Sequence, residues 1–86
     1  MEFEFDEAKS RANSLKHGID FVQAQELWND PAYTIITARS SVEDRFVIIA
    51  RREEESWSAI YTLRGEAIRI ISVRRSRQNE KEIYRG

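Results

Sequence analysis

Four segments in the second half of the chain are rich in β-branched and aromatic residues, and short connections separate them. They cover residues 33–38, 45–52, 56–64 and 67–75. Because such side chains pack well on a pleated surface, each segment is predicted to be a strand. The connections are too short for helical crossovers, so successive strands should run antiparallel. The sequence therefore predicts a meander at the centre of the fold.

The last two of these segments have the pattern of a hairpin that turns at Gly65 and Glu66. One face of the first strand is predicted to carry Trp57, Ala59, Tyr61 and Leu63, and the second strand alternates through Ile68, Ile70 and Ser72. A two-residue loop would place Thr62 opposite Arg69. Arg64 would then project from the same side as Ile60 and Ile71.

The first half of the chain predicts a short strand and two helices. Phe3 and Phe5 alternate with glutamates, which is typical of a strand. Asp6 is suited to cap a helix that ends at Gly18 and has an apolar face made of Ala8, Ala12 and Leu15. Asp20 and Gln23 have capping-box spacing for a second helix, which ends at residues 29–31 and buries Phe21, Ala24, Leu27 and Trp28.

A last short helix is expected after Ser76, its predicted cap, and would contain Gln78, Glu80, Ile83 and Tyr84. The predicted fold is one α+β domain over residues 1–86. Its helices, two N-terminal and one short C-terminal, pack on one face of a four- or five-stranded antiparallel sheet.

Composition narrows the class of protein. The 86 residues are 41% hydrophobic and 34% charged, which is typical of a small globular domain. The acidic start lacks the features of a secretory signal and no apolar run could span a bilayer, so we expect a cytoplasmic protein without membrane contact. Zero cysteines and a single histidine argue against disulfides and a zinc site. We expect neither a metal nor a cofactor.

Charge is segregated along the chain although the net charge is only −1. Residues 1–30 carry −4, residues 31–63 carry −1 and residues 64–86 carry +4. Residues 61–77 contain five arginines and one acidic residue, Glu66. Such a positive surface could hold phosphate, because the planar guanidinium suits bidentate phosphate binding. The alternative is that these arginines are solvated, or lay their aliphatic stems over Ile71.

Three runs of sequence resemble a known family: YTLRGEAIRIISVRRS at 61–76, DEAKSRANSLKHGIDF at 6–21, and NDP at 29–31. Together they resemble the BrnT toxins of bacterial BrnT/BrnA toxin–antitoxin systems, over nearly the whole chain. That family is similar in fold to the RelE-type messenger-RNA endonucleases. The resemblance implies an RNA substrate, a BrnA-type antitoxin partner and a hetero-oligomer formed with that antitoxin.

The residues available for chemistry favour RNA cleavage without a metal. The 2′-hydroxyl of RNA can attack the neighbouring phosphate if the protein supplies a base, a proton donor and positive charge. The resemblance to RelE-like enzymes implies that lysine, arginine and tyrosine can cover these roles. The candidate catalytic residues are His17, Arg64, Arg69, Tyr61 and Tyr84, and the candidate RNA-binding residues are Lys16, Arg45, Arg74, Arg75 and Arg77.

Some of these candidates have a structural alternative. His17 directly precedes the helix-ending Gly18, so its imidazole could instead satisfy the last helical carbonyls. Trp28 and Trp57 could stack on bases, but their positions fit core packing better. The predicted function is a metal-independent endoribonuclease toxin neutralised by an antitoxin. The alternative is a non-catalytic module that binds a nucleic acid or a protein through the same arginines.

Overall fold

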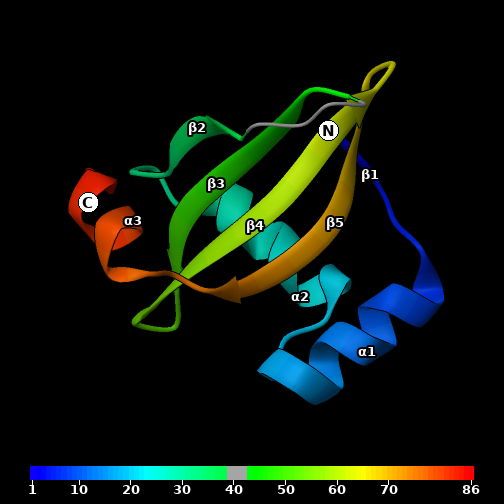
Figure 1. The fold of residues 1–86 in the computed structure, drawn as a ribbon, viewed down its shortest axis with the longest axis horizontal. Coiled ribbons are helices and arrows are strands. Elements are labelled where there is room, and N and C mark those ends of the chain that lie inside the picture. The colour runs from blue at the N-terminus through cyan, green and yellow to red at the C-terminus, as the bar shows by residue number, and fades with distance from the viewer. Residues whose placement is uncertain (39–42) are drawn as a thin grey trace.

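The computed structural model describes residues 1–38 and 43–86, which form a five-stranded sheet in the order β1-β5-β4-β3-β2 (Figure 1). The strands are β1 (Glu2–Glu4), β2 (Thr34–Ala38), β3 (Arg45–Arg52), β4 (Glu55–Arg64) and β5 (Ala67–Arg75). The predicted antiparallel meander from β2 to β5 is confirmed. The prediction of a fully antiparallel sheet is wrong, because β1 pairs in parallel with β5. A parallel pair needs a long crossover, and here the rest of the domain provides it.

The β4–β5 hairpin has the predicted register, with Thr62 opposite Arg69 and Gly65 at a φ of +59° in the turn. A β-bulge then interrupts the pattern. Ile60 pairs with Ser72 but Tyr61 pairs with Ile70, so Ile71 has no partner on β4. One extra residue reverses which side chains face the core. Val73 is therefore fully buried there, and the predicted place of Ser72 on that face is wrong.

Helix α1 (Glu7–His17) has the predicted boundaries. The Asp6 side chain accepts a hydrogen bond from the Lys9 N–H, and Gly18 ends the helix with a φ of +78°. Its predicted apolar face is wrong, because Ala8, Ala12 and Leu15 are all exposed. The buried side chains of α1 are those of Ser10 and Asn13. The helix lies along the free edge of β5, where polar side chains can bind backbone groups (Figure 1).

The predicted second helix is an α-helical turn, α2 (Phe21–Ala24), followed by the 3₁₀ helix η1 (Gln25–Asn29). Asp20 and Gln23 form the predicted capping box. This segment covers one face of the sheet, which we call the core face. The buried cluster combines Ile19, Phe21, Ala24 and Leu27 with side chains of three strands: Ile48, Ala50, Trp57, Ala59, Tyr61, Ile68, Ile70 and Val73.

Helix α3 (Gln78–Ile83) follows β5 and begins after Arg77. The predicted cap, Ser76, is instead buried and shares hydrogen bonds with Ser56 and Ser58. Ser58 also donates to Glu80 of α3. Because side chains alternate along β4, Ser58 points away from the core face, so α3 lies over the opposite, outer face. The expectation that all helices share one face is therefore wrong.

No helix among residues 1–38 and 43–86 is long and apolar enough to cross a membrane.

Candidate functional site

Arg69 lies on the outer face of β5 and is held by an acidic residue from the other end of the chain. Its Nη1 donates to Glu4 Oε2 at 2.8 Å, because β1 and β5 place the two residues side by side. The side chain of Arg69 is 29% exposed. A guanidinium has five N–H donors, and this contact uses one of them. The remaining donors can bind an anion on the outer face.

Two further arginines lie at the same end of the outer face. Arg64 ends β4, pairs with Ala67 and is exposed. Thr62, opposite Arg69, donates its hydroxyl to the carbonyl of Asp44 at 2.7 Å, which brings the start of β3 alongside. Arg45 begins β3, lies 3.9 Å from Glu43 and is 40% exposed. We call Arg45, Arg64 and Arg69 the hairpin-end arginines.

Lys16 and His17 lie together at the end of α1. With Ile71 and Ser72 of β5 they line a groove of about 230 Å³ between α1 and the free edge of that strand. His17 is half-buried and Lys16 is exposed. The groove is on the strand that also carries Arg69. The last turn of α1 is closed by the Gly18 N–H, which donates to the Ser14 carbonyl at 2.8 Å.

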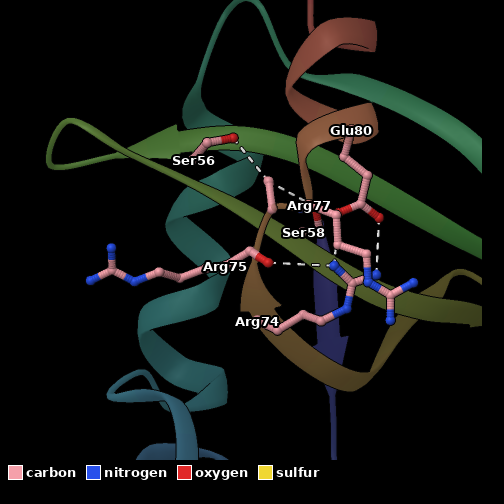
Figure 2. Close-up of polar contacts among 7 residues, drawn as sticks. Ser56, Ser58, Arg74, Arg75, Arg77 and Glu80 are labelled. Atoms are coloured by element: carbon pink, nitrogen blue, oxygen red, sulfur yellow. Dashed lines mark hydrogen bonds and ion pairs between the residues drawn. The ribbon is translucent and has the colours of Figure 1, made fainter.

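Arg74 belongs to a separate cluster at the opposite end of β5 (Figure 2). Its two Nη atoms donate to the two carboxylate oxygens of Glu80 at 2.7 and 2.9 Å. Ser58 and the backbone N–H of Arg77 donate to the same carboxylate at 2.9 and 2.8 Å. We call Arg74, Glu80 and Ser58 the α3 clamp, because they fix that helix to the sheet.

The α3 clamp holds Glu80 in its charged form. Burial alone would raise the pKa of this carboxyl, but the hydrogen bonds from Arg74, Arg77 and Ser58 outweigh burial and lower the pKa to about 2. A carboxylate bound this way is neither a proton donor nor an accessible base near neutral pH. The contacts of Arg74 with Glu80 also raise the pKa of its guanidinium. Arg74 therefore has a structural partner.

The two neighbouring arginines differ from Arg74. The side chain of Arg75 points away from the clamp (Figure 2), pairs with Glu55 at 2.6 Å and lies 5.3 Å from the ring centre of Trp57. Trp57 is itself buried in the core, as its alternation predicted. Arg77 is exposed at the start of α3.

The two candidate tyrosines do not share the outer-face site of the hairpin-end arginines. Tyr61 is buried on the core face, where its ring packs against Trp28 and Phe46, and burial raises its pKa. Tyr84 follows α3 and donates its hydroxyl to Asp30. Burial and this hydrogen bond raise the pKa of Tyr84. Neither hydroxyl faces the same part of the outer face as Arg69.

Among the residues that the structure describes, no three histidine, aspartate or glutamate side chains are grouped so that they could hold a metal ion.

Comparison with protein families assigns the chain. The family of ribonuclease toxins named BrnT, of type II toxin–antitoxin systems, matches residues 5–80. The chain belongs to the BrnT family. A search of the curated proteins finds no match. Membership identifies the chain, at the level of the family, as a ribonuclease toxin, and implies an RNA target and an antitoxin partner.

In this BrnT chain the predicted site residues divide into four places. The hairpin-end arginines share one end of the outer face, and Lys16 and His17 share the groove beside β5. The other residues are distributed over the α3 end and the core: Arg74, Arg75, Arg77, Tyr84 and Tyr61. Five of the ten predicted residues thus lie in two places: three arginines at the hairpin end of the outer face, and Lys16 and His17 beside Ile71 and Ser72 of β5.

The acidic partners of the arginines are what sequence reasoning about this BrnT chain missed. Three arginines are paired with Glu4, Glu80 and Glu55, which lie 65, 6 and 20 residues away. Counting carboxylates near each arginine in the sequence does not detect such pairs. Only the pairing of β1 with β5 brings Glu4 to Arg69, and no local pattern predicts that pairing.

Proposed function

We propose that this BrnT chain is a metal-independent endoribonuclease of the cytoplasm, held inactive by a BrnA-type antitoxin. The observation that carries the proposal is the hairpin-end cluster. Arg45, Arg64 and Arg69 come from three neighbouring strands and lie at one end of one face. A rigid sheet that presents several guanidinium groups is suited to bind the scissile phosphate in a fixed position.

In the proposed reaction the 2′-oxygen of RNA attacks the adjacent phosphorus while the bond from phosphorus to the 5′-oxygen breaks. The 2′-hydroxyl loses its proton to a base, and the leaving 5′-oxygen gains a proton. The products are a 2′,3′-cyclic phosphate and a 5′-hydroxyl. Arg64 and Arg69 stabilise the negative charge that develops on the phosphate oxygens. Arg45 binds a neighbouring phosphate.

His17 is the proposed proton-transfer group, because it is the single histidine of the chain and an imidazole can both accept and donate a proton. Its place beside Ile71 and Ser72 supports this role, since β5 also carries Arg69. Lys16 binds RNA from the same groove. Arg77, at the start of α3, binds a phosphate farther along the RNA. We leave Tyr61, Tyr84, Arg74 and Arg75 out of the reaction because each is committed to a contact elsewhere.

A non-catalytic binding module is the second candidate. One observation favours it: Arg69 has a carboxylate partner, as a residue that mainly stabilises the fold would. Such a module would bind RNA or an acidic protein through the same face but would leave every phosphodiester bond intact.

The test uses the purified chain and a short RNA that it cuts, next to the same RNA with one 2′-deoxy nucleotide at the cut position. We expect cleavage of the all-ribose RNA to continue in EDTA. The deoxy-substituted RNA should bind with similar affinity and stay uncut, because it lacks the nucleophile. Cleavage of that substrate, or activity that EDTA abolishes and a divalent metal restores, would contradict the mechanism. Binding without any cleavage would favour the binding module.

A further inference from the structure

The outer edge of β2 is built differently from the other edge of the sheet. β2 is the last strand in the sheet order, so one side of its backbone has no neighbouring strand among the described residues. Residues 33–38 include no charged side chain. Tyr33 and Ile35 are each 42% exposed. An uncharged edge with exposed apolar side chains is a template for pairing with another strand.

The opposite edge is protected in two ways. β1 is three residues long and carries Glu2 and Glu4, and charged residues on a short strand discourage pairing with another chain. Beyond β1, the edge of β5 is covered at Val73, whose N–H and C=O both bind the Asn13 side chain at 3.2 and 2.9 Å. Among the described residues, the β1 edge is thus protected, whereas β2 has no strand beside it and is contacted at its first residue, where the Arg85 N–H donates to Thr34 Oγ1 at 3.2 Å.

We propose that β2 is the docking edge for the antitoxin, which adds an extended segment as a sixth strand beside it. This inference rests on the proposed function in that it takes the partner to be the antitoxin. In an antiparallel edge strand, alternate residues direct their N–H and C=O groups away from the sheet. Another strand satisfies these groups in order, so the open edge defines an extended occupant rather than a helix.

The side chains of β2 indicate which residue types the antitoxin segment should carry. Ile35 is opposite Ile48, which is fully buried, so Ile35 and Tyr33 lie on the core face. On the outer face, Ile36 is opposite Val47. A strand beside β2 would therefore bury apolar side chains at alternate positions against Ile35 and Tyr33. The antitoxin segment should carry β-branched or aromatic residues in that pattern.

The length of β2 favours an antitoxin over a second copy of this chain. Its five residues span about 17 Å at the rise of a strand. Two such edges side by side give a much smaller contact than the roughly 1,200–2,000 Å² of a stable interface. A segment of a longer partner can continue beyond the edge and bury additional surface.

The experiment uses the full chain and the product of the neighbouring reading frame, where an antitoxin is expected. Ile35→Lys and Thr37→Lys each place a charge on the exposed side of β2, and Leu63→Lys is the matched control at an exposed apolar position of β4. We expect each β2 variant to bind the partner at least about tenfold more weakly, with unchanged RNA cleavage by the free protein. Leu63→Lys should bind normally. In the complex, hydrogen exchange of the residue 34–38 amides should slow.

Each other result overturns the inference. Normal partner binding by both β2 variants, or unchanged exchange over residues 34–38, would place the antitoxin elsewhere. If the chain alone forms a dimer that Ile35→Lys dissociates, the occupant of the edge is a second copy of the chain. If the neighbouring reading frame encodes no protein that binds this chain, the antitoxin is not the occupant. The RNA assay keeps the proposed function separate. If the unaltered chain does not cleave RNA, the proposed function is wrong. Partner binding by the β2 variants tests only the docking edge.

Discussion

Asn13 pairs with Val73 through both atoms of its side-chain amide. Its Nδ2 donates to the Val73 carbonyl at 2.9 Å, and its Oδ1 accepts from the Val73 N–H at 3.2 Å. The same Nδ2 donates to the Ile19 carbonyl at 2.8 Å. One side chain of α1 therefore satisfies three buried backbone groups and takes the place of a strand at the edge of β5.

Replacing this amide should destabilise the fold strongly. Asn13→Leu fills a similar volume but leaves the three backbone groups without partners, and each unsatisfied buried group costs about 1–3 kcal/mol. We expect a loss of about 3 kcal/mol in the free energy of unfolding, measured by urea denaturation. Ser14→Ala, an exposed neighbour on α1, is the control and should change stability little. A fully stable Asn13→Leu protein would show that the pairing contributes nothing.

The α3 clamp should make stability depend on pH in a defined window. The pKa of Glu80 is about 2 in the folded protein against 4.5 for the ordinary carboxyl, so the folded state favours the charged form. Its contribution is therefore fully present above about pH 4.5 and is lost as the pH falls toward 2. Since the side chain is almost fully buried, solvent screens these contacts little, and we expect a contribution of roughly 3 kcal/mol.

Glu80→Gln is the matched variant for this clamp. It keeps the size of the side chain but cannot change its charge, so its unfolding free energy should vary less between pH 5 and pH 2.5. Denaturation curves of both proteins at the two pH values make the comparison. The same pH dependence in both proteins would assign the acid sensitivity to other carboxyls, such as Asp30. Burial alone would raise the pKa of Asp30, but hydrogen bonds from Tyr84 and from the Arg51 and Ala32 backbone together lower it.

The turn between β3 and β4 holds two non-glycine residues in the left-handed region. Glu53 and Glu54 have φ values of +52° and +69°. Because glycine adopts this conformation without steric cost, Glu54→Gly should stabilise the protein by up to about 1 kcal/mol. Glu55→Gly should do the opposite, since it puts a glycine at the start of β4 and removes the ion-pair partner of Arg75. Thermal denaturation compares the melting temperatures of the two variants. A lower melting temperature for Glu54→Gly than for the unaltered chain would show that the left-handed backbone at Glu54 is not strained.

Local patterns predicted the β4–β5 hairpin well, because alternation and the turn at Gly65 together leave one register for Thr62 and Arg69. The same logic failed on α1. It selected Leu15 by hydrophobicity, but the buried side chains there are polar ones that bind backbone groups 6 and 60 residues away. Hydrophobic periodicity detects a face that packs by burial and does not detect a face that packs by hydrogen bonds.

The sequence predicted only those features of the candidate site that depend on the alternation of side chains along the strands. The positions of Arg64 and Arg69 on one face follow from strand alternation. The burial of Tyr61 follows from the same alternation, which placed it with Trp57 and Ala59 and therefore away from those arginines. The pairing of Arg69 with Glu4 depends on the parallel strand β1, whose partner no local pattern specifies.

The most direct measurement is the rate of RNA cleavage by Arg69→Ala and Glu4→Ala. If Arg69 stabilises charge on the phosphate, Arg69→Ala should reduce the rate about a hundredfold. Glu4→Ala breaks the same ion pair but keeps the guanidinium, so its rate should stay close to that of the unaltered chain, as should the stability of both folds. Equal losses of activity in the two variants, in proportion to lost stability, would contradict the account and make the ion pair structural.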